Sequence, residues 1–499
     1  MSTSIPFLDK TFWITESEDN PKHVASLQLL DMPEGAGEDY IETLVAKLRT
    51  FDTAVAPLNY RVKSIFRYPL KFVPVDKLDM DYHVQLKEVD DVADMQALHE
   101  VVARLHEPCL ERDKPLWQFT VIKGKQGSRF AVYVKIHHML GDGATMVRWF
   151  QAGYSPEPHI DDFMPVWAME RKKRSRPKQN PVTQFFKGLY DFVIATFDLF
   201  WILFRLLLKL VRINPVYMPV PFSGTKTLLT GQVKRGRCVA TTDMDFDRIQ
   251  KVGKRLRATV NEVLLCCFDI GVHRFLKDHG HTFDKALYTN MPINLRKPGE
   301  QTGGNKIAIV PVMLAHGKSD PYLRLRQIIE NHRIVKRAAK RSHPGAFSYY
   351  TVLIQTFALV FEMFRASALF RPIANILISN VPGPKDTRYF RDAKLLALYP
   401  ISTIVPGGGV NITLLTYGNK ANVGIVCCDT KIKSLENMAM YFNDAFDLLE
   451  KSIEDHEVSV EDIGERTTTP ATLVDDDPYK HDHHHDEEHE RTLDKVENQ

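Results

Sequence analysis

Apolar and polar residues alternate through residues 129–138, RFAVYVKIHH. The apolar positions recur at every second residue: Phe130, Val132, Val134 and Ile136. This spacing predicts a strand with one buried face. A glycine-rich turn, MLGDGAT, follows, and ATMVRWF opens a helical pattern. Two adjacent histidines, His137 and His138, therefore lie where a strand gives way to a loop, a common position for functional groups.

Similar patterns occur in the second half of the chain. Residues 410–417 and 421–428 alternate on either side of Gly418-Asn419-Lys420, which predicts a hairpin. Residues 375–380 form an apolar strand that runs into a Pro-Gly turn. Helical periodicity covers residues 321–341 and 435–453.

The most apolar stretch is residues 181–214. As a helix, its 19 residues 192–210 would reach about 28 Å, close to the thickness of a bilayer core. At about 100° per residue, however, its charged residues fall within one stripe roughly 60° wide. These residues are Lys187, Asp191, Asp198, Arg205, Lys209 and Arg212. Because charges are costly inside lipid, the stripe is expected to face protein, headgroups or water, as in a helix lying on a membrane.

Five basic residues lie within Arg171–Arg176, just before this helix, and they would attract anionic headgroups. We expect residues 185–213 to associate with a membrane surface. A buried interdomain helix is the alternative, and the basic run alone would also fit a linker or a nuclear import patch. The region also marks the expected boundary between the two halves of the chain.

Composition and charge narrow the class of protein. The 499 residues are 44% hydrophobic, enough for a large core in two or three domains. The net charge is +3, but residues 451–499 carry 16 acidic and 5 basic residues, so the body is basic. No nucleic-acid motif accompanies this charge. The acidic tail contains six histidines and is expected to be disordered, with loose metal binding as the alternative.

The cysteines and the N-terminus suggest a cytosolic origin. Four of the six cysteines form adjacent pairs, Cys266/Cys267 and Cys427/Cys428. Neighbours in sequence rarely form a disulfide with each other, so a reducing compartment fits best. The first residues show no secretory signal.

An ordered series of motifs makes the sequence recognisable. DKTFWITESEDNPKHV near the N-terminus, DKPLWQF, HHMLGDG, RATVNEVLLCCF, MPINLR, ISNVPGP and VPGGGVNITLL follow one another along the chain. Over about residues 7–450 the sequence resembles the wax ester synthase/diacylglycerol acyltransferase family. The resemblance implies an α/β, two-domain fold like that of chloramphenicol acetyltransferase, with mixed sheets and an active-site tunnel between the domains.

We therefore expect four regions. Residues 1–170 would form an N-terminal acyltransferase domain, 171–224 the basic linker and apolar helix, 225–453 a C-terminal acyltransferase domain, and 454–499 the tail.

The resemblance also implies the chemistry. Acyl transfer from a thioester to an alcohol requires a base for the hydroxyl proton, and a neutral imidazole suits that task. The resemblance assigns this role to His138. His137, its neighbour on an extended chain, is expected to point the opposite way and to pack.

Four further residues receive expected roles. Asp142 would be structural and paired with an arginine, for which Arg296 is the candidate, and Gly143 would give the loop its tight path. Asn261 would donate to the oxyanion. The spacing of Thr259 and Glu262 equally predicts a capping box that starts a helix. Family members usually have Asp where Glu262 stands, which leaves a catalytic role at this position open.

Two motifs are candidates for lining the substrate channel. One is Pro115, Leu116 and Trp117, for which core packing is the alternative. The other is the turn with Ser379, Asn380, Pro382 and Gly383, which would otherwise be purely structural.

These observations favour an O-acyltransferase that moves a long-chain acyl group from acyl-CoA to a fatty alcohol, to diacylglycerol or to both. Acyl-CoA would be a co-substrate, and no bound cofactor or metal is expected. The enzyme would sit on a membrane or lipid-droplet surface facing the cytosol, on the endoplasmic reticulum or a droplet if the source is eukaryotic. An acyltransferase for a smaller alcohol and a non-catalytic lipid-binding protein are the alternatives.

Overall fold

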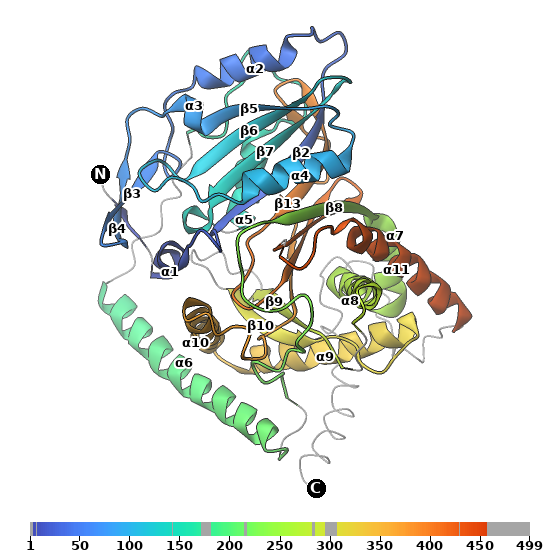
Figure 1. The fold of residues 1–499 in the computed structure, drawn as a ribbon. Helices are drawn as coiled ribbons and strands as arrows, with labels where there is room; N and C mark the ends of the chain where they lie inside the picture. Colours follow the sequence, from blue (N-terminus) through green and yellow to red (C-terminus); the bar gives the residue numbers. More distant parts are fainter. Residues whose placement is uncertain are drawn as a thin grey trace.

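The computed structural model describes residues 3–5, 7–141, 143–170, 181–213, 217–281, 285–294, 307–428 and 430–456. Two six-stranded mixed sheets form the centres of the two halves, and a three-stranded sheet lies at one edge (Figure 1). The small sheet has the order β1-β4-β3 and consists of β1 (Thr3–Ser4), β3 (Tyr60–Ile65) and β4 (Tyr68–Pro74).

The first large sheet has the order β12-β13-β2-β7-β6-β5. Only β5 and β6 pair in parallel. Its strands are β2 (His23–Asp31), β5 (Val84–Val89), β6 (Trp117–Gly124), β7 (Arg129–His137), β12 (Tyr389–Phe390) and β13 (Ala393–Ile401).

The second large sheet has the order β10-β9-β11-β14-β15-β8. In it β11 runs parallel to both of its neighbours, and the other pairs are antiparallel. Its strands are β8 (Cys238–Asp245), β9 (Tyr288–Asn294), β10 (Ile307–Met313), β11 (Ile376–Val381), β14 (Val410–Tyr417) and β15 (Lys420–Cys427).

Helices surround both sheets. Those of the first half are α1 (Phe7–Thr15), α2 (Tyr40–Arg49), α3 (Met80–His83), α4 (Met95–His106), a 3₁₀ turn η1 (His138–Leu140) and α5 (Gly143–Gly153). The later ones are α6 (Pro181–Leu210), α7 (Phe246–Leu256), α8 (Val260–Asp278), α9 (Pro321–Arg341), α10 (Pro344–Met363) and α11 (Glu436–Asp455). Helix α4 contacts β8, so it lies between the halves, whereas α6 runs along α10 at the outside (Figure 1).

The elements expected from periodicity are confirmed. The strand at 130–136 is β7, the hairpin is β14 and β15, and the helix predicted over 321–341 is α9. Helix α9 begins at this point because the Asp320 carboxylate accepts a hydrogen bond from the Leu323 N–H at 2.9 Å, and Pro321 follows at the first helical position.

Two strands cross between the halves. Strands β12 and β13 follow β11 in the chain, yet β13 pairs with β2 and completes the first sheet. β13 also packs on β14 and β15 of the second sheet. The approach is so close that a side chain at Gly424 of β15 would place its Cβ 1.8 Å from the Pro400 carbonyl oxygen of β13. The junction of the two halves therefore depends on a glycine.

We predict that Gly424→Ala lowers the free energy of unfolding by about 1–3 kcal/mol, because the added methyl group must push β13 and β15 apart. Gly188→Ala in α6 is the matched control. No heavy atom lies within 4 Å of its added Cβ, so it is expected to stabilise the helix by about 1 kcal/mol. Urea unfolding measures both, and equal stability of Gly424→Ala and wild type would contradict the packing.

Candidate active site

The two histidines lie at the end of β7, where the strand enters η1. β7 pairs with β2 along its whole length, with His137 opposite His23. Two more backbone hydrogen bonds hold the chain at the end of the strand. The His137 N–H donates to the Leu116 carbonyl at 3.0 Å, and the His138 N–H donates to the Lys22 carbonyl at 2.8 Å. The backbone of both histidines is therefore fixed by neighbouring segments.

The His137 side chain points into the core and is fully buried. Its Nδ1 accepts a hydrogen bond from the Met139 N–H at 3.1 Å, which fixes the turn that follows. Its Nε2 lies 3.3 Å from Oε1 of the buried Glu16. The His137 side chain therefore has a structural role within the first domain.

Glu16 is a buried carboxylate beneath the motif. Its Oε1 accepts from the Lys22 N–H at 3.1 Å, and Arg112 lies 3.4 Å from Oε2. Burial alone would raise the pKa of Glu16, but His137, the Lys22 N–H and Arg112 together hold the pKa below its ordinary value of 4.5. Glu16 therefore remains charged and holds His137 in place.

The His138 side chain faces the other way. Its ring stacks on Phe12 of α1, with centroids 4.2 Å apart and planes 14° apart. It lies on the wall of a cavity, together with Gly143 at the start of α5. The stack on Phe12 fixes the plane of the imidazole beside this cavity.

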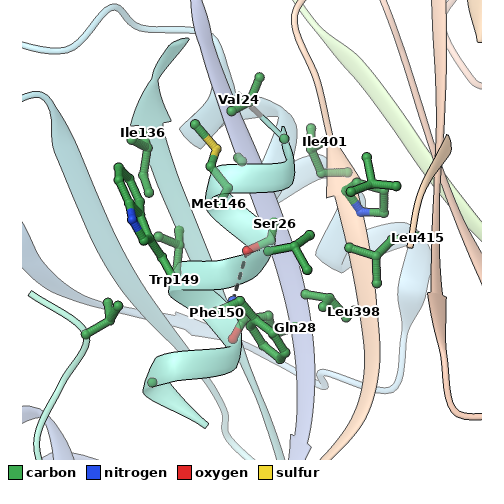
Figure 2. A pocket seen from close by; sticks show the side chains of 18 of the residues that line it. Val24, Ser26, Gln28, Ile136, Met146, Trp149, Phe150, Leu398, Ile401 and Leu415 are labelled. Atoms are coloured by element: carbon green, nitrogen blue, oxygen red, sulfur yellow. Dashed lines mark hydrogen bonds between the residues drawn. The ribbon is translucent and has the colours of Figure 1, made fainter. Parts of the chain in front are cut away.

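The cavity has a volume of about 1170 Å³ including its opening to solvent, and its wall is predominantly apolar. It lies between α5, strands β2, β7 and β13 of the first sheet, and β11 and β14 of the second (Figure 2). Its wall includes Val24, Ile136, Met146, Trp149, Phe150, Val381, Leu398, Ile401 and Leu415. A long hydrocarbon chain fits such a wall better than a polar substrate does.

A polar group lies farther along the cavity. Gln28 is four residues beyond Val24 on β2, so it lies about 13 Å along the strand. Its Nε2 donates to the Ser26 hydroxyl at 2.9 Å, as Figure 2 shows, and its Oε1 accepts from the Tyr154 hydroxyl. Burial raises the pKa of Tyr154 well above its ordinary value, so this hydroxyl stays neutral.

Asn261 lines a second cavity of about 390 Å³, and Ser379 lies on the walls of both cavities. Asn261 is the second residue of α8, and its Oδ1 accepts a hydrogen bond from Asn380 Nδ2 at 2.6 Å. The structure thus brings Asn261, Ser379 and Asn380 together, while His138 lies on the first cavity.

The capping box at the start of α8 is confirmed. The Glu262 N–H donates to the Thr259 hydroxyl at 3.2 Å, and Glu262 Oε2 accepts from the Thr259 N–H at 2.8 Å. The buried Glu262 also binds His332 Nδ1 of α9 at 2.7 Å through Oε1. Position 262 therefore joins two helices, which requires no catalytic role.

The remaining candidates lie elsewhere. Pro115, Leu116 and Trp117 are buried in the first domain and are not among the described lining residues. Trp117 stacks on Trp167 and donates to the Leu58 carbonyl at 2.8 Å.

The turn after β11 contributes little to the cavity. Pro382 is exposed, and Gly383 donates its N–H to the Thr416 hydroxyl at 3.1 Å. Asp142 and Arg296 lie outside the described residues, so their predicted pairing remains a prediction. Within the described ranges there is no group of three or more His, Cys, Asp or Glu placed to hold a metal ion.

Sequence reasoning missed Phe12, Glu16, Gln28 and Tyr154. No local pattern marks Glu16 or Phe12, because each meets the histidines only through tertiary packing of α1 and the segment after it. Alternation along β2 predicts that Gln28 shares a face with Val24 and Ser26, which was the available signal for the cavity wall.

Comparison with solved structures defines the class of fold. A wax ester synthase/diacylglycerol acyltransferase from Marinobacter aquaeolei VT8 superposes with a TM-score of 0.71 at 23% identity, covering 91% of this chain and all of that one. The first condensation domain of the calcium-dependent antibiotic synthetase gives a TM-score of 0.56 at 13% identity, covering 94% of this chain and 99% of that one. The predicted chloramphenicol-acetyltransferase-like two-domain fold is confirmed.

Sequence comparison then gives the family. The model of the wax ester synthase/diacylglycerol acyltransferase catalytic domain matches residues 6–264, and that of the family's C-terminal domain matches residues 303–450. The O-acyltransferase WSD of Acinetobacter baylyi is 28% identical, over 89% of this chain and 96% of its own length. A probable diacylglycerol O-acyltransferase of Mycobacterium tuberculosis is 27% identical, over 89% and 98%. The chain belongs to the wax ester synthase/diacylglycerol acyltransferase family, a family of O-acyltransferases.

The Glu16 contact generates a stability prediction. Glu16→Gln removes the charge that faces His137, and we expect a loss of about 1–3 kcal/mol in the free energy of unfolding near pH 7. Because the folded pKa of Glu16 is lowered, its contribution is present above the unfolded value of 4.5 and is lost as the pH falls below it.

Chemical unfolding at several pH values measures this difference. Glu100→Gln on α4 is the control, since this exposed carboxylate lies 4.0 Å from Arg104 and contributes little. The role of Glu16 would be contradicted if the wild type were no more stable to unfolding than Glu16→Gln near neutral pH. It would also be contradicted if this difference did not shrink below pH 4.5.

Proposed function

We propose that this protein transfers a long-chain acyl group from acyl-CoA to a fatty alcohol, to diacylglycerol or to both, with His138 as the general base. The observation that carries the proposal is the position of His138 on the wall of a large apolar cavity in a chain of this family. An apolar chain entering this cavity would place its reactive end beside the imidazole.

The proposed reaction requires no reactant besides acyl-CoA and the acceptor alcohol. As the acceptor's oxygen attacks the thioester carbonyl, its hydroxyl proton passes to His138. The carbon–sulfur bond then breaks, CoA leaves as a thiolate, and the imidazolium returns the proton to the sulfur. The products are an ester and free CoA.

Asn261 is proposed as an oxyanion donor. Because Asn380 donates to Oδ1 of Asn261, the amide Nδ2 of Asn261 is the atom that would donate to the tetrahedral intermediate. Ser379, on both cavity walls, marks where the two cavities approach each other. The proposal places the reacting carbon in that region.

A panel assay separates this function from its alternatives. Radiolabelled palmitoyl-CoA is offered with hexadecanol, diacylglycerol and short soluble alcohols, and ester formation is measured. We expect transfer to the long-chain acceptors. Transfer to short alcohols alone would indicate the smaller-alcohol enzyme, and binding without turnover would indicate a lipid-binding protein.

We predict that His138→Ala lowers kcat by about 10²–10⁴-fold while the protein stays folded, because this range is typical for the loss of a general base. His137→Ala is the matched variant. It removes a buried contact to Glu16 and is expected mainly to lower Tm. Comparable losses of kcat in both folded, purified variants would contradict the assignment of His138 as the base and His137 as a structural residue.

We propose, in addition, that the protein associates with a membrane surface through α6. The middle of its charged stripe faces the protein, whereas Lys187 and Arg212 near its ends are exposed. Asp198 Oδ2 accepts from the His343 N–H at 2.6 Å, and Lys209 donates to the Tyr217 carbonyl. Asp191 lies 3.6 Å from His343 Nε2. The outer face is apolar and exposed along the helix, with Phe186, Tyr190, Val193, Phe197, Phe200, Phe204 and Leu207 at alternating spacings of four and three residues.

The inner side of α6 also buries apolar residues, Ala195, Ile202 and Leu206, so the helix is apolar on both its inner and its outer face. The exposure of the outer face counts against the alternative of a buried interdomain helix, since Phe197 is 70% exposed and α6 packs along α10 at the outside. Of the helices in the described ranges, α10 is the one long and apolar enough to cross a membrane by length and composition, but it packs against β10 and α6. An apolar outer face of this extent supports a lipid surface as its environment.

We expect the double variant Phe197→Ser/Phe200→Ser to bind phospholipid vesicles at least about tenfold more weakly, because each buried Phe contributes about 1.5–3 kcal/mol. Vesicle co-sedimentation measures the change. Met440→Ser on α11, which is 52% exposed, is the matched control and is expected to bind as wild type does. Unchanged binding by the double variant would contradict the role of α6.

A further inference from the structure

The hairpin of β3 and β4 has an unusual turn. Its two central residues, Phe66 and Arg67, have φ angles of 47° and 68°, both in the left-handed region. Two-residue hairpins that require positive φ strongly favour Asn-Gly, because residues with larger side chains are strained there. A phenylalanine at this position indicates that something other than hairpin stability selects the side chain.

The tip exposes an apolar cluster. Phe66 is 100% exposed, and the neighbouring Ile65, Tyr68 and Leu70 are 53%, 48% and 39% exposed. The buried residues of the two strands are Val62 of β3 and Pro69 and Phe72 of β4. We name residues 65–70 the hairpin tip.

The charges around the tip have one sign. Residues 61–71, RVKSIFRYPLK, contain Arg61, Lys63, Arg67 and Lys71 and no acidic residue. All four basic residues are exposed. An apolar tip flanked by cations is complementary to a phospholipid surface, where acyl chains lie beneath anionic headgroups.

The tip is also tied to the active site. Trp13 Nε1 donates to the Arg67 carbonyl at 2.9 Å, and Arg112 lies over the Trp13 ring at 4.3 Å. Phe12, the residue before Trp13, stacks on His138. One helix, α1, therefore contacts both the hairpin tip and the His138 ring.

We propose that the hairpin tip inserts into the surface of a phospholipid bilayer and is a second lipid contact besides α6. Figure 1 shows the hairpin and the beginning of α6 on the same, left-hand edge of the molecule. This inference rests on the proposed function, because long-chain acceptors are dissolved in lipid and an enzyme that uses them gains from contact with a lipid surface. Insertion of the tip places α1, and with it His138, next to that surface.

The test replaces the turn by its preferred sequence. Phe66→Asn/Arg67→Gly places residues that tolerate positive φ at both turn positions. The backbone strain is thereby relieved, so Tm is expected to rise or stay unchanged. Binding to phosphatidylcholine vesicles containing phosphatidylglycerol is expected to weaken about tenfold, because a large apolar side chain and a cation are lost from the contact. A gain in stability together with a loss of binding is not expected from a merely structural hairpin.

Two further variants complete the design. Lys63→Gln/Lys71→Gln is expected to weaken binding to the anionic vesicles and to leave binding to pure phosphatidylcholine vesicles unchanged. Leu448→Ser on α11, which is 50% exposed, is the matched apolar control and is expected to bind as wild type does.

The outcomes separate the two proposals. Equal vesicle binding by wild type and Phe66→Asn/Arg67→Gly overturns the inference, and so does a wild-type protein that binds neither kind of vesicle, since the tip would then fit a protein partner. Acyl transfer to detergent-dispersed hexadecanol is measured on the same wild-type preparation. Its absence contradicts the proposed function without altering the vesicle result.

Discussion

The alternation of side chains at the end of β7 is the constraint on which the candidate site depends. Adjacent residues of an extended chain point to opposite sides, so one histidine of the pair enters the core when the other faces the cavity. The buried Glu16 fixes which one is inside, because its carboxylate faces His137. Backbone hydrogen bonds to Leu116 and Lys22 keep the pair at this register. The orientation of His138 is therefore set from within the first domain.

Local patterns in the sequence predicted the elements but not how they meet. Period-two alternation identified β7, β14 and β15, and helical periodicity identified α9, because these signals depend on neighbouring residues. Family resemblance located His138 and Asn261. The exchange of β13 into the first sheet and the contacts of Phe12 and Glu16 with the histidines bring together residues far apart in the chain, which no local pattern encodes.

The apolar helix shows what periodicity can and cannot decide. Its charged stripe was visible in the sequence, together with the expectation that the stripe avoids lipid. Only the structure shows which way the stripe faces. The His343 N–H donates a hydrogen bond to Asp198, and Lys209 donates one to the Tyr217 carbonyl. Because these partners lie on the protein side, the apolar side is the one left exposed. The hairpin tip gave no alternating signal, and its importance became visible only from the exposure and backbone conformation of Phe66.

Acyl-CoA is proposed to bind in the cavity beside His138 while His137 stays in the core. Histidine modification by diethyl pyrocarbonate, mapped by tandem mass spectrometry with and without palmitoyl-CoA, tests it most directly. The account predicts that His138 is modified, that palmitoyl-CoA protects it, and that His137 is not modified while the protein is folded. Modification of His137 in the folded protein, or modification of His138 that palmitoyl-CoA does not reduce, would contradict it.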